Sequence, residues 1–90
     1  MSGVIYLHLG QNVVVPTSEI LGIFDLDNTT GSKITRDFLS LAEKTGRIIN
    51  ISDDLPKSFV VCGENENIRI YLSQLSPATL LKRSETMNLS

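Results

Sequence analysis

The chain is poor in the residues that build metal sites and covalent cross-links. Its 90 residues include one cysteine, Cys62, and one histidine, His8. A single cysteine cannot form an internal disulfide, and no Cys or His cluster has a zinc-binding spacing. This composition excludes a disulfide-stapled secreted domain and a zinc module. We therefore expect a cytoplasmic protein that holds no metal and no cofactor.

Long apolar runs and an excess of one charge are also missing. No stretch approaches the roughly 20 apolar residues that a membrane helix needs. The first residues carry no basic side chain before their apolar stretch, so we expect no secretory signal and no membrane partner. Eight Lys and Arg oppose ten Asp and Glu, a formal net charge of −2. No global field then draws the chain toward nucleic acid, and any DNA binding must come from a local patch.

The length and the apolar content point to self-association. Ninety residues suffice for one small domain and exclude a two-domain enzyme or a barrel of repeated units. Hydrophobic residues nevertheless make up 41% of the chain, more than a small interior easily hides, and leftover apolar surface usually lies in a subunit interface. We predict one domain over residues 1–84, a frayed tail over residues 85–90, and a homo-oligomer.

The pattern of apolar residues predicts an α+β fold, a small antiparallel-rich sheet with two helices. β-Branched and aromatic runs bounded by Gly, Pro, Asn and Asp are typical of strands. One helix is expected from residue 33 to 45 and a second from residue 76, where Ser76-Pro77 forms a capping start. The order is βββ-α-βββ-α. The predicted strands are residues 4–9, 13–15, 20–24, 47–51, 58–62 and 68–72.

The helix over residues 33–45 has the clearest pattern. Four apolar side chains recur at helical spacing along it and are expected to be buried together. Ser32 is expected to cap its first turn and Gly46 to end it in a left-handed conformation. The buried stripe is Ile34, Phe38, Leu41 and Ala42, and its expected strand partners include Ile5, Leu7, Ile49 and Val60.

A short acidic motif imitates a catalytic one. Asp25, Asp27 and Thr29 follow a strand and resemble the first motif of the haloacid-dehalogenase-type phosphatases, in which an aspartate attacks phosphorus and helps to hold Mg²⁺. That family needs a large parallel sheet, which the order βββ-α-βββ-α does not supply. The acidic residues are instead interpreted as the end of a strand and a turn. We predict no enzyme activity.

The segments taken in order resemble the RemA/RemB family of short extracellular matrix regulatory proteins, on its RemB side, found in Gram-positive, mostly spore-forming bacteria. The similarity spans about residues 4–84. The segments that carry it are Tyr6-Leu7-His8-Leu9-Gly10, Val13-Val14-Val15, Ile20-Leu21-Gly22-Ile23-Phe24-Asp25, Leu55-Pro56-Lys57-Ser58 and Ser76-Pro77-Ala78-Thr79-Leu80-Leu81-Lys82-Arg83.

The resemblance implies a cytoplasmic transcriptional regulator of biofilm matrix genes. The RemA branch forms closed rings and binds DNA around them through an arginine-rich loop. That loop aligns with Asp-Asp-Leu-Pro-Lys-Ser at residues 53–58, in which Lys57 is the sole cation, and a further basic position of RemA aligns with Glu19. Arg83 matches a basic position of the family. The candidate DNA-binding residues are therefore Lys57, Lys82 and Arg83, contacting phosphates rather than base edges.

Two hypotheses remain open from the sequence. One is a regulator that binds DNA as a ring-like homo-oligomer, which the resemblance favours. The other is an oligomeric protein-interaction module with little or no DNA binding, which the acidic balance and the loop at residues 53–58 favour. The protein partner, the DNA site and the ring size have no signature in the sequence.

Overall fold

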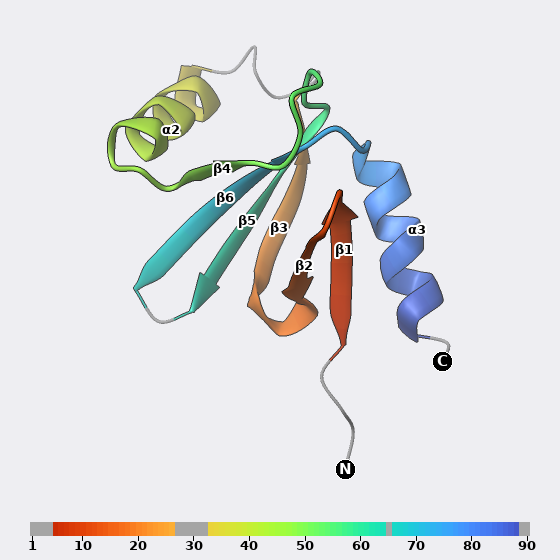
Figure 1. Cartoon of the computed structure of the whole chain (residues 1–90). Coiled ribbons are helices and arrows are strands. Elements are labelled where there is room, and N and C mark those ends of the chain that lie inside the picture. The colour runs from red at the N-terminus through yellow and green to blue at the C-terminus, as the bar shows by residue number, and fades with distance from the viewer. Residues whose placement is uncertain (1–4, 27–32, 65, 89–90) are drawn as a thin grey trace.

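The computed structural model describes residues 5–26, 33–64 and 66–88. It confirms the α+β class and the element order, with a turn of 3-10 helix, η1, after the second strand. The cap predicted at Ser32 lies outside the described residues, as do Asp27 and Thr29 of the acidic motif. The elements (Figure 1) are β1 (Tyr6–Gly10), β2 (Val13–Pro16), η1 (Thr17–Glu19), β3 (Ile20–Asp25), α2 (Lys33–Lys44), β4 (Ile48–Asn50), β5 (Ser58–Glu64), β6 (Asn67–Ser73) and α3 (Pro77–Asn88).

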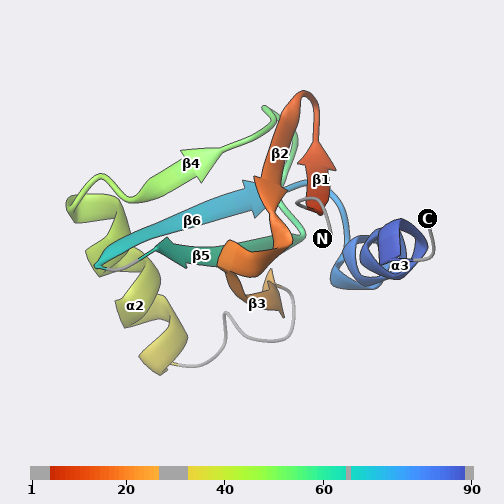
Figure 2. The same cartoon turned by 90° about the horizontal axis from the view of Figure 1, so that it is seen from below.

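The six strands divide into two sheets. β3, β5, β6 and β4 form a four-stranded sheet in that order, in which β4 runs parallel to β6 and the other pairs are antiparallel. β1 and β2 form a separate antiparallel hairpin. Pro16 has no N–H to extend the ladder of β2, and η1 then turns the chain so that β3 enters the other sheet. Figure 2 shows the hairpin on one side of β5 and β6 and α2 on the other.

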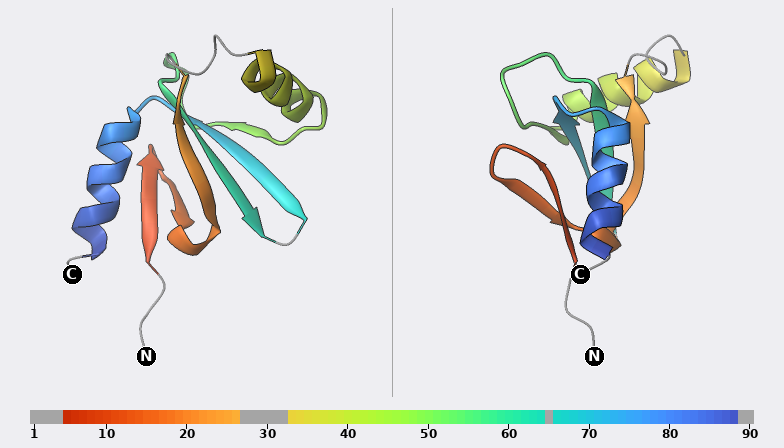
Figure 3. Two further views of the ribbon diagram at one scale, coloured as in Figure 1. Left: turned by 180° about the vertical axis from the view of Figure 1, so that it is seen from behind. Right: turned by 90° about the vertical axis from the view of Figure 1, so that its right-hand side faces the viewer.

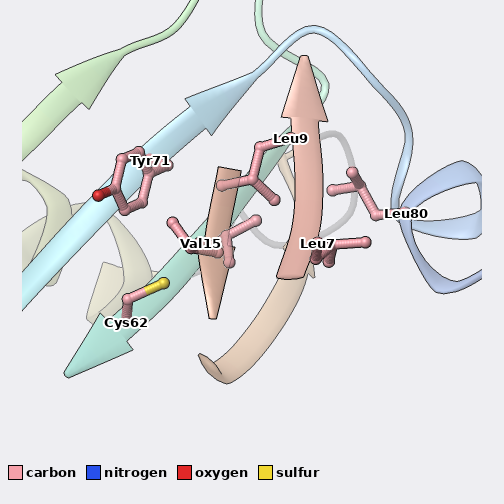
Figure 4. Close-up of a cluster of buried hydrophobic side chains, with 7 residues drawn as sticks. Leu7, Leu9, Val15, Cys62, Tyr71 and Leu80 are labelled. Carbon is pink, nitrogen blue, oxygen red and sulfur yellow. The ribbon is translucent and has the colours of Figure 1, made fainter. Parts of the chain in front are cut away.

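The main core lies between the hairpin, the four-stranded sheet and α3. Alternate residues of each strand point to opposite faces of a sheet, so Val60 and Cys62 of β5 point toward the hairpin. Leu80 brings α3 against the same cluster (Figure 4). The buried members are Leu7, Leu9, Val15, Val60, Cys62, Tyr71 and Leu80.

A second, smaller core lies on the opposite face of the sheet. Phe59 of β5 and Ile70 of β6 point toward α2, which contributes Ala42. Leu39 of α2 packs at the edge of this cluster and is half-buried. The sheet is therefore apolar on both faces, and among the described residues α2 is the helix that packs on this second face.

The prediction that α2 buries its whole apolar stripe is wrong. Ala42 is buried, but Ile34 keeps 82% of its surface exposed and Leu41 keeps 62%, and Phe38 is exposed as well. The expected partners Leu7 and Val60 belong to the core on the other face of the sheet. The 3.6-residue period shows that a helix has an apolar face, but it does not show what covers that face.

The C-terminal end of α2 follows the sequence prediction. Gly46 has φ +71°, the left-handed region that glycine adopts without strain. The Gly46 N–H donates to the Glu43 carbonyl at 3.1 Å, and the Arg47 N–H donates to the Ala42 carbonyl at 2.8 Å. These two bonds form a Schellman cap, which satisfies carbonyls of the last turn and sends the chain into β4.

The last helix, α3, begins as predicted and runs further than predicted. The Ser76 hydroxyl accepts a hydrogen bond from the Thr79 N–H at 3.2 Å, so Ser76 caps the first turn. The helix continues to Asn88, through most of the segment expected to fray. The views in Figure 3 place α3 and α2 at opposite ends of the molecule. No helix within the described residues is both long and apolar enough to cross a membrane.

Candidate functional site

Lys57 has a fixed backbone and an exposed side chain. Its N–H donates to the Ser73 carbonyl at 2.8 Å, and its carbonyl accepts from the Leu26 N–H at 3.0 Å. The strand β5 begins at the next residue, Ser58, whose buried hydroxyl donates to the Leu75 carbonyl at 2.8 Å. The ammonium group is therefore presented to solvent from a rigid position beside the start of α3.

The other two predicted cations lie on α3. Lys82 is exposed, whereas Arg83 is half-buried and its Nη1 donates to the His8 carbonyl at 3.3 Å. Arg83 therefore ties α3 to β1 with part of its guanidinium. Both residues lie about 8 Å along the helix axis from Pro77. The structure thus places Lys57 at the N-terminal end of α3 and the other two cations further along it.

Arg69 is held by an ion pair that spans the two halves of the chain. Its guanidinium pairs with the Glu19 carboxylate and lies 5.9 Å from the ring centroid of Tyr71. The hydrogen bond that Arg69 donates to Glu19 raises the pKa of Arg69 further above its ordinary value. Glu19 therefore anchors η1 to β6. Sequence reasoning missed this pair because its members are 50 residues apart.

The acidic motif forms no metal centre within the described residues. Asp25 ends β3 opposite Ser58 of β5, and Asp27 lies outside the described residues. Asp53 and Asp54 are exposed in the loop before β5. No group of three His, Cys, Asp or Glu side chains is close enough to hold an ion in the part of the chain described. The absence of enzyme activity stays a prediction.

His8 and Cys62 both occupy structural positions. His8 is exposed on β1, and its Nε2 is hydrogen-bonded to the Gln11 carbonyl across the hairpin turn. Cys62 is completely buried in the main core. Burial raises the pKa of its thiol to about 11, so the reactive thiolate is scarce at neutral pH.

One surface within the described residues is apolar. We define the α2–β3 face by five exposed side chains, and a groove of about 330 Å³ separates its helical part from its strand part. The stacked rings of Phe24 and Phe59, with centroids 5.0 Å apart, form part of the groove wall. The five side chains of the α2–β3 face are Leu21, Phe24, Ile34, Phe38 and Leu41.

The described structure therefore offers two surfaces that suit macromolecules and no catalytic constellation. One is the set of cations beside and on α3, and the other is the α2–β3 face. Charged side chains with exposed ends suit phosphates. An exposed apolar patch rimmed by polar residues is typical of a protein interface.

Comparison with known proteins covers nearly the whole chain. The RemA-like family, described as "Extracellular matrix regulatory protein A-like", matches residues 6–83. The chain is 39% identical over 82 residues to Extracellular matrix regulatory protein B of Bacillus subtilis (strain 168), a match that covers 91% of this chain and 93% of that protein. The matched range includes both cores, Lys57, Lys82 and Arg83. The chain therefore belongs to the RemA-like family of extracellular matrix regulatory proteins.

Proposed function

We propose that the protein is a cytoplasmic regulator of the transcription of extracellular matrix genes. The observation that carries this proposal is the end-to-end match to Extracellular matrix regulatory protein B, which leaves little of either chain unmatched. Two proteins of this identity and coverage share their fold. The composition, with one buried cysteine and no zinc cluster, agrees with a reducing compartment.

We further propose that it acts as a ring-like homo-oligomer that contacts DNA phosphates through Lys57, Lys82 and Arg83. Cations from one subunit make too few contacts for stable binding. Repetition around an oligomer multiplies them into a belt along the duplex. Arg83 has two roles in this proposal. One N–H of its guanidinium holds α3 to the His8 carbonyl, and the other N–H groups of the same guanidinium contact a phosphate.

A gel shift against promoter fragments of matrix genes tests the DNA contact. The triple variant Lys57→Ala, Lys82→Ala, Arg83→Ala is expected to lose more than about tenfold in affinity on every DNA sequence. The matched control removes three cations from α2, as Lys33→Ala, Arg36→Ala, Lys44→Ala, and is expected to bind like the wild type. Both variants need the wild-type sedimentation coefficient for the comparison to hold. Undiminished binding by the first variant would show that the assigned residues are wrong.

A transcription assay tests regulation in the cell. Deletion of the gene should change the expression of the matrix genes, and the wild-type chain should restore it. The α3-side triple variant should fail to restore it while reaching the same cellular level. If that variant fully restored matrix-gene expression, regulation would not require the DNA contacts of these three residues.

The second candidate function is an oligomeric protein-interaction module. The loop before β5 favours it, because Asp53 and Asp54 are exposed there and Leu55 has 87% of its surface exposed. An apolar side chain next to two acidic side chains suits a protein surface better than a phosphate backbone. If the wild-type oligomer binds no DNA even at low salt, this second function is the correct one.

A further inference from the structure

Two serine side chains are completely buried close to the start of α3. Ser58 begins β5, and it pairs with Ser73 at the end of β6 in the antiparallel ladder. Among the described residues these are the two polar side chains with no exposed surface. A buried hydroxyl costs free energy unless it is hydrogen-bonded. The contacts that these two hydroxyls make therefore decide whether the fold tolerates them.

The Ser73 hydroxyl joins three segments of the chain. It donates to the Leu9 carbonyl at 2.7 Å and accepts from the Leu75 N–H at 3.1 Å. The Ser58 hydroxyl adds a bond to the same connection, because it donates to the Leu75 carbonyl at 2.8 Å. Figure 1 shows the end of β1 beside the connection from β6 to α3. The two serines therefore fix both of these segments to the end of the four-stranded sheet.

Ser73 also connects two of the candidate phosphate-binding cations. Its carbonyl accepts from the Lys57 N–H at 2.8 Å. Its hydroxyl holds Leu9, and the preceding carbonyl, that of His8, accepts from the Arg83 guanidinium at 3.3 Å. Lys57 and Arg83 are far apart in the sequence and lie on different segments. Ser73 is the residue through which the backbone of one and the side chain of the other are held together.

A fixed separation between cations favours the simultaneous binding of two phosphates. Phosphates are regularly spaced along a DNA strand. Cations that already keep one separation lose less conformational freedom when both bind. Hydrogen bonds behind the binding residues supply this precision. The Ser73 side chain has no exposed surface, so it touches no DNA and acts through the cations.

We propose that Ser73 is a positioning residue for DNA binding, which holds Arg83 at a fixed separation from Lys57. Ser58 assists by holding the connection to α3. The inference rests on the proposed function, in which both cations contact phosphates. Loss of the Ser73 hydroxyl leaves the two cations in the chain but frees the end of β1 and the start of α3, and the separation is no longer fixed.

A double-mutant cycle on DNA affinity, measured by fluorescence anisotropy at low salt, tests this role. Ser73→Ala is expected to weaken binding at least about threefold in the wild-type background. In the Lys57→Ala background it should change the affinity by less than about twofold, because no separation from Lys57 is left to lose. The Lys57 side chain takes no part in the bonds of Ser73, which use its N–H. A merely structural serine would cost the same factor in both backgrounds.

The matched control is Ile70→Val, which removes a buried methylene from the same strand on the opposite face of the sheet. It should keep the wild-type affinity. Ser58→Ala is a second test variant, expected to show the same dependence on Lys57 with a smaller loss. Urea unfolding and sedimentation of every variant give the folded and assembled fraction in the assay. If Ser73→Ala does not fold, the cycle is completed with Ser58→Ala.

The results that contradict the inference differ from those that contradict the proposed function. An equal loss in both backgrounds would show that Ser73 supports the fold alone, and an unchanged affinity in Ser73→Ala would show that it positions nothing. In both cases DNA binding by the wild type stands. If Lys57→Ala binds like the wild type, or if the wild type binds no DNA, the proposed contacts are wrong and the positioning role is wrong with them.

Discussion

Cys62 shows how position controls the chemistry of one residue. Its side chain lies in the main core and pairs in the ladder with Arg69. Burial is the main reason that the pKa of the thiol is raised to about 11, and the negative charge of Glu19 raises it further. The positive charge of Arg69 lowers the pKa by less than burial raises it. The folded chain therefore holds this proton at a pH where the unfolded chain has released it.

This shift predicts a loss of stability in alkali. The pKa of the thiol is 9.0 in its ordinary state and about 11 in the folded chain. Because the pKa is raised in the folded chain, the contribution of the protonated Cys62 thiol to stability is complete below about pH 9 and is lost as the pH rises toward 11. The free energy of unfolding, measured with urea at pH 7 to 10.5, should decline more steeply with pH for the wild type than for Cys62→Ala. Parallel declines in the two proteins would contradict the assignment.

Asp25 illustrates the opposite case, a chemically suggestive residue in a structural position. We expect Asp25→Asn to leave DNA binding and regulation unchanged, because the residue ends β3 beside Ser58 and belongs to no acidic cluster within the described residues. A phosphate-ester assay with Mg²⁺ should give the same background rate for both chains. Turnover that disappears in Asp25→Asn would establish the enzyme activity that we predict to be absent.

At the scale of elements, the two helices are attached in different ways. α3 is capped by Ser76, packs Leu80 into the main core and is tied to β1 by Arg83. α2 rests on the sheet mainly through Ala42 and Leu39 and leaves its stripe exposed. α3 therefore belongs to the folding core of the single chain, whereas most of the apolar stripe of α2 lies outside that core.

Two neighbouring leucines of α3 make this difference measurable. Leu80 has no exposed surface and Leu81 is 54% exposed. Leu80→Ala is expected to lower the free energy of unfolding by about 2–5 kcal/mol, through lost burial and the cavity left behind. Leu81→Ala, with the same change in helix propensity, should lower it by less than about 0.5 kcal/mol. Chemical denaturation measures both, and equal losses would show that α3 is not anchored through Leu80.

At the scale of the whole molecule, the net charge of −2 requires that any DNA binding be local. The affinity of the wild type is expected to fall with salt with a log–log slope of about −0.9 for each phosphate contacted. The triple variant Lys57→Ala, Lys82→Ala, Arg83→Ala should have a slope shallower by about 3 for each subunit that touches DNA. Titration by fluorescence anisotropy over a range of salt concentrations measures both slopes. Identical slopes would mean that these cations contact no phosphate.

Local patterns predicted the elements well and their partners less well. The presence of the strands, the Ser76 cap and the left-handed Gly46 depend on neighbours within a few residues, and the structure confirms them, although most strand ends differ from the prediction by one or two residues. The sequence did not predict the pairing of Glu19 with Arg69, because contacts at that separation depend on how the strands are arranged. Of the candidate site, the exposure of Lys57 was predictable from its loop. The bond from Arg83 to the His8 carbonyl was not.

The sequence by itself determined the α+β class and the order of the elements, because periodicity, capping residues and turn chemistry act over short distances. The family followed from the similarity of the chain to known proteins. Only the tertiary structure decided that the strands divide into two sheets and that β4 lies parallel to β6. It alone showed that three of the four stripe residues of α2 stay exposed in the single chain. An apolar stripe must be buried, but hydrophobic burial is non-directional, and the stripe carries no record of whether its cover comes from the same chain.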